Sequence, residues 1–365
     1  MTGDPSSAPT TELDKIVESI LGRDTDDFAL ATVVGTRGST YRGLGARQLV
    51  RADGVSVGTV SGGCLDSDLR AVAERVMAGG VAEIVTFDLT ADDEAIWGWG
   101  IGCNGVTELL VEPAASARPL AHRIVRARAE QRPLAVVHDL SRPGRRWFVD
   151  RADSDGPDEI ARAATSALDE GWPRVEEISG VRYMIEVVGA PSRLVVCGAG
   201  HDASPVVEFG ARLGFEVTVV DDRRQFLTRE RFPQAARLVH SRPSALADAV
   251  ELDSRTYVVL MSHNYLRDLD YLRAVLGTDV AYVAALGPGE RLRRLLADLE
   301  EQGIRPTEAD LAKLHGPAGL DIGAEGPDEI AWAIMAEILA VRRGKPGGRL
   351  RDRKGPKLIR TGGAE

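Results

Sequence analysis

A cysteine at the predicted start of a helix is the residue of this sequence that most clearly could do chemistry. Cys64 lies in the stretch GTVSGGCLDSDL at residues 58–69, where apolar residues then recur at the spacing of one helical face, with Ser61 as a candidate N-cap. Gly62 and Gly63 would leave backbone N–H groups exposed beside the positive end of the helix dipole, which favours an anion. That anion could be a bound phosphate or the thiolate of Cys64 itself. The alternative is an unreactive cysteine, buried between the helix and a strand.

A second glycine-rich stretch, residues 35–46, follows a predicted strand at residues 28–34 and carries positive charge. Its glycine content predicts a loop rather than a regular element. Arg37, Arg42 and Arg47 lie in this stretch or directly after it, so guanidinium groups and bare backbone amides could meet around one anion. A loop whose arginines are simply solvated is the other interpretation, and the sequence does not decide between them.

A third glycine-rich stretch, residues 96–105, carries Cys103 just before a predicted strand at residues 106–111. Two thiols on glycine-lined loops, Cys64 and Cys103, could converge on one soft metal–sulfur ligand. They could equally lie apart, because the sequence gives no distance between them.

The second half of the chain shows the pattern of a dinucleotide-binding fold. A short apolar strand at residues 193–198 runs into the sequence GAGHDA, a helix follows, and a second strand ends at Asp221. In this arrangement Gly198 and Gly200 would let a pyrophosphate approach the helix start, and Asp221 would bind a ribose. Because His201 stands where a small residue usually leaves room for the phosphates, the pattern predicts a Rossmann-type fold more firmly than a bound dinucleotide.

Strands and helices continue to alternate after this motif, which predicts a parallel, doubly wound sheet. His263 follows one of the strands at its carboxyl end, the usual ligand position in such sheets, although it could also be a turn residue. Cys197 lies inside a strand and is expected in the core. The predicted fold class is therefore α/β, with an N-terminal α/β domain over residues 11–188 and a C-terminal Rossmann-like domain over residues 191–342.

Charge and cysteine content limit the partners and the compartment. Residues 1–10 are small and polar, and residues 343–365 belong to a basic tail rich in Gly and Pro, so disorder is expected at both ends. The net charge of −10 argues against non-specific nucleic-acid binding, and no segment is apolar enough to span a membrane. Three widely spaced cysteines argue against a disulfide framework and predict a cytoplasmic protein.

Taken together, the motifs resemble those of the XdhC/CoxI family, accessory proteins that mature molybdenum hydroxylases such as xanthine dehydrogenase. The resemblance rests on GSTYRGLGA at residues 38–46, GTVSGGCLD at 58–66 and GCNG at 102–105 in the first half, and on CGAGH at 197–201, SHN at 262–264 and HGPAGLDIGA at 315–324 in the second. Asp66 and Asn104 depart from the family pattern, which usually has Glu and Gly at these positions.

The resemblance implies a chaperone that holds molybdenum cofactor, a pterin dithiolene with a terminal phosphate, while the cofactor is sulfurated. It also implies delivery to an apo molybdenum hydroxylase, with a cysteine desulfurase as the sulfur donor. Thiolates of Cys64 and Cys103 would contact the metal–sulfur centre. The stretch with Arg37, Arg42 and Arg47, or the turn before Cys64, would hold the phosphate. A homodimer is expected only from the frequency of dimers among soluble proteins.

Two alternatives stay open at this point. The first is an NAD(P)-dependent oxidoreductase that uses the Rossmann-like domain, with a thiol or His263 in the chemistry. The second is a regulator that senses redox state through Cys64 and Cys103. The crowding of the glycine motif by His201 favours the non-catalytic chaperone over the oxidoreductase.

Overall fold

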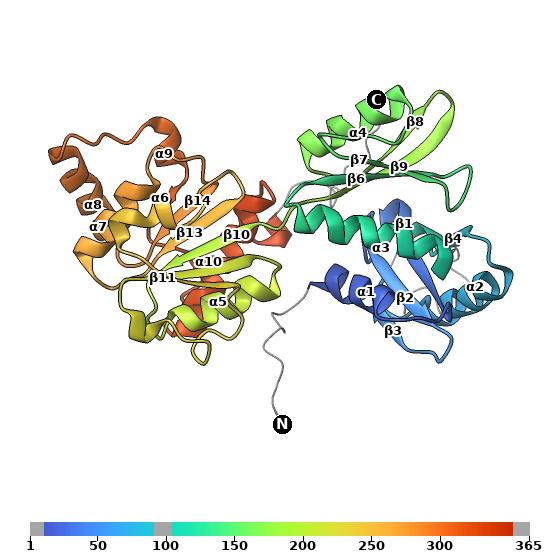
Figure 1. Cartoon of the computed structure of the whole chain (residues 1–365), viewed down its shortest axis with the longest axis horizontal. Helices are drawn as coiled ribbons and strands as arrows, with labels where there is room; N and C mark the ends of the chain where they lie inside the picture. Colours follow the sequence, from blue (N-terminus) through green and yellow to red (C-terminus); the bar gives the residue numbers. More distant parts are fainter. Residues whose placement is uncertain (1–10, 91–103, 353–365) are drawn as a thin grey trace. The chain divides into compact units, whose positions relative to one another are not determined.

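The computed structural model describes residues 11–90 and 104–352, which form two compact units, each with its own core (Figure 1). The first unit comprises residues 12–190 of the described chain, and the second comprises residues 191–352 together with Thr11. None of the described helices combines the length and the apolar content that crossing a membrane requires.

The first unit is built on two antiparallel sheets. The five-stranded sheet has the strand order β3-β2-β1-β5-β4, and the four-stranded sheet has the order β7-β6-β9-β8. The strands are β1 (Phe28–Ser39), β2 (Arg47–Arg51), β3 (Ser56–Gly58), β4 (Glu83–Asp88), β5 (Asn104–Pro113), β6 (Leu134–Asp139), β7 (Arg146–Val149), β8 (Arg174–Ile178) and β9 (Val181–Val188). The helices are α1 (Glu12–Leu21), α2 (Asp66–Gly79), α3 (Ala114–Ala129) and α4 (Asp158–Glu170).

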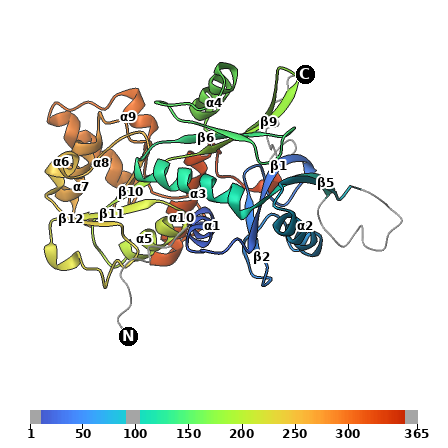
Figure 2. The same ribbon diagram turned by 45° about the vertical axis from the view of Figure 1, so that its right-hand side comes forward.

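Helix α3 lies between the two sheets of this unit (Figure 2). Its buried residues, among them Leu120, share one core with Phe28 of the five-stranded sheet and Val136 of the four-stranded sheet. Helix α2 covers the opposite face of the five-stranded sheet, and α4 covers the other face of the four-stranded sheet. The two sheets therefore face each other, and side chains between them can come from both.

Strand β1 is longer than the sequence predicted. The expected strand ended at residue 34, but pairing with β5 continues to Ser39, so the prediction of a loop is wrong for residues 35–39. Val33 pairs with Leu109 and Gly35 pairs with Glu108, which leaves Val34 as the extra residue of a β-bulge. Glycine and polar residues after the bulge hid the strand, because they lack the apolar alternation of a half-buried strand.

The second unit is a six-stranded sheet in which every strand is parallel to its neighbours, in the order β12-β11-β10-β13-β14-β15. The α/β class and the doubly wound parallel sheet predicted from the sequence are confirmed. The strands are β10 (Arg193–Cys197), β11 (Glu216–Asp221), β12 (Arg237–His240), β13 (Thr256–Leu260), β14 (Tyr282–Ala285) and β15 (Leu314–His315). The α-helices are α5 (Ala203–Arg212), α6 (Leu246–Ala249), α7 (Tyr265–Val275), α8 (Gly289–Glu301), α9 (Glu308–Ala312) and α10 (Pro327–Arg342).

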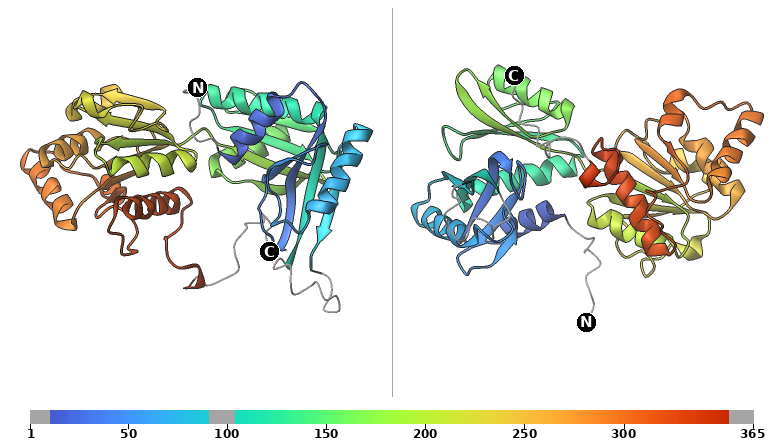
Figure 3. Two further views of the ribbon diagram at one scale, coloured as in Figure 1. Left: turned by 90° about the horizontal axis from the view of Figure 1, so that it is seen from below. Right: turned by 180° about the vertical axis from the view of Figure 1, so that it is seen from behind.

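Helices cover both faces of this parallel sheet. Helices α5 and α10 pack together on one face, and α7 and α8 share a second core with the other face (Figure 3). Cys197 is fully buried in that second core, as expected for a residue inside a strand. Because the strands are parallel, their carboxyl ends meet at one edge of the sheet, where α/β proteins bind ligands.

Candidate functional site

Cys64 lies exposed on the turn that leads into α2. Gly63 has a φ of 106°, a value that L side chains rarely adopt, so the tight turn depends on glycine. The Ser61 hydroxyl accepts a hydrogen bond from Gly63 N (3.1 Å) and donates one to the Asp66 carboxylate (3.2 Å). The alternative of a cysteine buried between helix and strand is therefore wrong.

The same turn corrects the expected helix cap. Leu65 occupies the N-cap position of α2 and no side chain caps the helix, so Ser61 stabilises the turn rather than the helix end. Asp66 and Asp68 lie in the first helical turn, and their carboxylates already complement the positive end of the helix dipole. A second anion at this helix start would have to compete with them.

A tyrosine from the arginine-rich stretch contacts the cysteine turn. A Cβ placed on Gly62 would lie 3.6 Å from two ring carbons of Tyr41, so the ring packs against the Gly62 backbone. Tyr41 is 59% exposed. Two of the predicted glycine-rich stretches therefore meet in space, and an aromatic ring lies beside the turn that carries Cys64.

The three arginines of the predicted anion loop do not converge. Arg47 is buried, and both of its terminal nitrogens lie 2.5 Å from the carboxylate oxygens of buried Glu186. Arg42 forms a two-pronged ion pair with Glu12, at 3.0 and 2.7 Å. The expectation that the three guanidiniums bind one anion is corrected, because Arg47 is buried against Glu186 and Arg42 is directed to Glu12 of α1.

Arg37 is the exception among the three. It lies exposed near the end of β1, and its guanidinium forms no hydrogen bond or ion pair with another residue of the described chain. Its charge reaches Asp88, whose pKa is lowered mainly by hydrogen bonds from Thr90 and to a smaller extent by Arg37. Arg37 therefore has a guanidinium available for a ligand.

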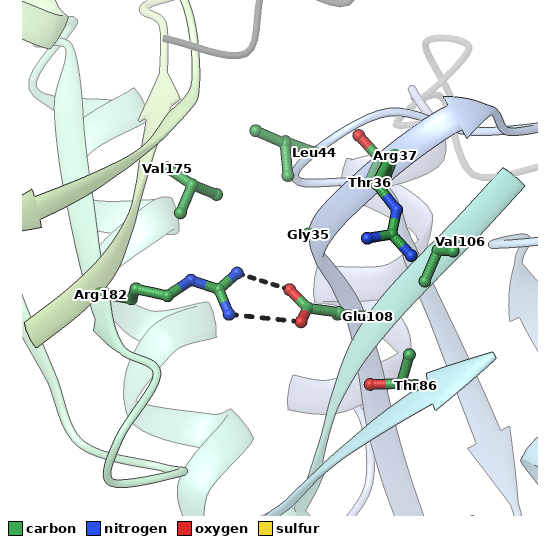
Figure 4. A pocket seen from close by; sticks show the side chains of 9 residues that line it. All are labelled: Gly35, Thr36, Arg37, Leu44, Thr86, Val106, Glu108, Val175 and Arg182. Carbon is green, nitrogen blue, oxygen red and sulfur yellow. Dashed lines mark hydrogen bonds and ion pairs between the residues drawn. The ribbon is translucent and has the colours of Figure 1, made fainter. Parts of the chain in front are cut away.

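Arg37 lines a cavity of about 450 Å³ in the first unit. Figure 4 shows that side chains from both sheets surround it, and that Arg182 of β9 forms a two-pronged ion pair with Glu108 of β5. The lining residues are Gly35, Thr36, Arg37, Leu44, Thr86, Val106, Glu108, Val175 and Arg182. Sequence reasoning missed Glu108 and Arg182, because 74 positions separate them and neither lies in a motif.

Cys103, the second predicted thiol, lies outside the described residues. Strand β5 begins directly after it, at Asn104, and the backbone of Asn104 pairs with Ser39 of β1. Among the residues that the structure describes, no three His, Cys, Asp or Glu side chains are grouped so as to hold a metal ion.

In the second unit, the predicted glycine motif brings His263 close to the first turn of α5. His263 has a φ of 54°, a conformation uncommon for a residue with a side chain, and its Nε2 lies 2.6 Å from Asp202 Oδ2. A Cβ on Gly200 would lie 2.5 Å from Asp202 Oδ1. The Asp202 carboxylate therefore lies over the backbone of Gly200, which sequence reasoning had assigned to a pyrophosphate.

Asp221 is buried, and both of its carboxylate oxygens accept hydrogen bonds. Its carboxylate accepts hydrogen bonds from Ala199 N (2.7 Å) and Arg223 N (2.8 Å), and it also pairs with the Arg223 guanidinium. Burial alone would raise the pKa of Asp221, but these hydrogen bonds and the Arg223 charge lower it. Gly198 is needed for packing within the fold, because a Cβ at this position would lie 2.5 Å from the Met261 carbonyl oxygen. The fifth predicted residue of this unit, His201, is exposed.

Comparison with known proteins gives matches in both units. A model of the XdhC and CoxI family matches residues 22–88, and a model of the XdhC Rossmann domain matches residues 194–338. A crystal structure described as a xanthine dehydrogenase from Bacillus halodurans aligns with a TM-score of 0.78 at 28% identity, covering 94% of this chain and 98% of that one.

Two curated relatives match over most of their length. A protein of Bacillus subtilis (strain 168) that is described as a probable xanthine dehydrogenase subunit is 29% identical over 343 residues, which are 91% of this chain and 97% of the relative. The molybdenum cofactor insertion chaperone PaoD of Escherichia coli (strain K12) is 26% identical over 321 residues, which are 86% of this chain and 83% of PaoD.

Proposed function

The chain belongs to the XdhC and CoxI family, and on that premise we propose that it is a chaperone for molybdenum cofactor. It holds the cofactor as cargo while the cofactor is sulfurated, and delivers it to an apo enzyme of the xanthine dehydrogenase type. The similarity to PaoD, whose name describes a molybdenum cofactor insertion chaperone, supports this role because it spans most of both chains.

The observation that carries the proposal is the exposed thiol of Cys64 on a glycine-dependent turn, with the ring of Tyr41 alongside. A soft thiolate suits a molybdenum–sulfur centre. Gly62 and Gly63 leave the backbone open beside the thiol, and Cys103 is proposed as the second sulfur contact. The cofactor phosphate is assigned to Arg37, because no carboxylate of the described residues holds its guanidinium, whereas Arg47 is buried against Glu186 and Arg42 is directed to Glu12 of α1.

The oxidoreductase alternative is not supported by the contacts in the second unit. The Asp202 carboxylate lies where a dinucleotide would place its pyrophosphate, and two negative groups there repel each other. Asp221, the expected ribose ligand, already accepts from two backbone N–H groups and pairs with Arg223. His263 also bonds to Asp202, whose carboxylate lies over the Gly200 backbone.

The proposal includes an apo molybdenum hydroxylase as the recipient and a cysteine desulfurase as the sulfur source. A homodimer and a cytoplasmic location complete it. Each of these four points stays a prediction of the proposed function.

The test is to purify the chain without oxygen from cells that make molybdenum cofactor, and to measure bound molybdenum and pterin. We expect Cys64→Ala to lose most of both, because the metal–sulfur contact is removed. Cys197→Ala is the matched control, since that thiol is buried in the core of the second unit. Thermal unfolding of each variant verifies that the fold is retained.

Equal molybdenum content in wild type and Cys64→Ala would remove this thiol from the mechanism. NADH or NADPH should leave the melting temperature unchanged, since a ligand raises it only when it binds the folded chain. A rise of several degrees with either nucleotide would favour the oxidoreductase instead.

A further inference from the structure

The pocket of Figure 4 is built on two rows of side chains that are neighbours on one face of the five-stranded sheet. Gly35, Glu108 and Thr86 are paired across β1, β5 and β4. In the next row on the same face, Arg37 pairs with Val106 of β5. These rows place a cation beside the Glu108 carboxylate.

The β-bulge at Val34 is what turns Arg37 toward this face. Before the bulge, Ala31 and Val33 pack with α2 on the opposite face of the sheet. The extra residue shifts the alternation by one, so that Arg37 lies on the same face as Glu108. In a regular strand, Arg37 would have been directed toward α2.

The walls of the pocket are partly apolar and come from both sheets. Leu44 and Val175 join Val106 around the charged groups. A volume of about 450 Å³ lies within the range of small-ligand pockets in proteins. The pocket therefore combines an apolar surface for a flat ring with cations for an anionic group.

The charges that line the pocket favour an anion. Arg37 and Arg182 both face it, and among the described residues that line it Glu108 is the one carboxylate (Figure 4). Arg182 holds Glu108 at 2.8 and 3.4 Å, with 53% of its own side chain exposed and 24% of the Glu108 side chain exposed. An exposed ion pair of this kind contributes little to stability, so a ligand can displace it.

We propose that this pocket binds a phosphorylated pterin, with the phosphate between Arg37 and Arg182. The phosphate takes the position of the Glu108 carboxylate, because phosphate pairs with guanidinium groups in the same two-pronged way. The pterin ring lies against Leu44 and Val175. This inference rests on the proposed function, since it identifies the part of the cofactor that the pocket would hold.

Glu108 would compete with the phosphate of the ligand for the Arg182 guanidinium. It pairs with Arg182 when the pocket holds no phosphate, and it has room to do so because Gly35, its partner on β1, has no side chain. A Cβ on Gly35 would collide with the Glu108 carboxylate. Removing the Glu108 charge should therefore strengthen binding, whereas removing either guanidinium should weaken it.

The test is a fluorescence titration of the purified chain with neopterin monophosphate, with neopterin and inorganic phosphate as separate probes. We expect the phosphorylated pterin to bind at least about tenfold more tightly than neopterin, since each guanidinium contact adds a charge-assisted hydrogen bond. Arg37→Gln and Arg182→Gln should each lose about tenfold in affinity, and Glu108→Gln should gain several-fold.

Arg75→Gln is the matched control, because Arg75 also forms a two-pronged pair with a glutamate, Glu83, but lies on α2 and outside the pocket. It should leave the titration unchanged. Equal affinity for neopterin and its monophosphate, or identical titrations for all four variants, would overturn the proposal. Binding of inorganic phosphate that responds to Arg37 while neopterin monophosphate does not bind would also overturn it.

Molybdenum retention separates this proposal from the proposed function. If wild type retains molybdenum after anaerobic purification but the titrations do not depend on Arg37, the pocket assignment is wrong and the chaperone role stands. If the titrations depend on Arg37 and Glu108 but wild type retains no molybdenum, the pocket binds phosphorylated pterins and the chaperone role is wrong.

Discussion

Two of the Arg–Glu pairs that connect the two sheets of the first unit lie in opposite environments. Arg47 and Glu186 are 3% and 7% exposed, whereas Glu108 and Arg182 are 24% and 53% exposed. Both pairs use strand β9, which supplies the glutamate of the buried pair and the arginine of the exposed one. The surroundings of the two pairs therefore differ much more than their chemistry.

The difference in burial indicates which ion pair has a structural role and which one can give way to a ligand. A buried charge without its partner is costly, so the Arg47–Glu186 pair helps to hold the two sheets in one arrangement. An exposed pair is screened by water and can exchange partners at little cost. An arginine in a glycine-rich motif can therefore belong to either kind, and burial decides which.

The largest expected effect comes from breaking the buried pair. Glu186→Leu leaves the Arg47 guanidinium buried without its carboxylate, so the free energy of unfolding of the first unit should fall by about 3–5 kcal/mol. Urea unfolding followed by circular dichroism measures this loss, with the transition of the first unit analysed separately.

The double variant Arg47→Met with Glu186→Leu is the control for that measurement. It removes both charges and should recover most of the lost stability, because an apolar pair can replace a buried ion pair. A double variant as unstable as Glu186→Leu alone would mean that packing, and not the unpaired charge, causes the loss.

A somewhat smaller effect is expected from acid. Burial alone would raise the pKa of Glu186, but the charge of Arg47, the nearby imidazole of His138 and the hydrogen bonds from Arg47 hold it at about 2, below the ordinary value of 4.5. The pair therefore stabilises the fold fully above pH 4.5 and loses this contribution as the pH falls toward 2.

The measurement compares wild type with Glu186→Leu across that pH range. The stability advantage of wild type should shrink by roughly 3 kcal/mol as the carboxylate is protonated. A constant difference between the two proteins at every pH would show that Glu186 does not contribute through its charge.

The fold of the second unit could be predicted from the sequence because the patterns that indicate it are local. The strand at residues 193–197 is a short apolar run ahead of the GAGHDA motif, and alternation with helices then requires a parallel sheet. Cys64 was placed near a helix start by the glycines before it, and the structure puts it on the exposed turn before α2.

The roles of the arginines could not be predicted from the sequence, because their partners are distant in the chain. Arg47 lies 139 positions from Glu186, and nothing near Arg47 distinguishes a buried pair from a ligand site. The bulge at Val34 moves Arg37 to the pocket face, and a one-residue shift in strand pairing leaves no clear pattern in the sequence. Long-range pairing and register are thus the parts of this site that only the structure supplies.

The smallest expected effect on stability comes from the exposed pair. Arg182→Gln breaks the pair with Glu108 but leaves both groups in contact with water, so the free energy of unfolding should change by less than about 1 kcal/mol. The same urea experiment measures the change, and about 1 M salt should reduce it further because exposed charges are screened. A loss as large as that of Glu186→Leu would mean that the Glu108 pair also holds the sheets together, and the contrast between a structural pair and an exchangeable one would fail.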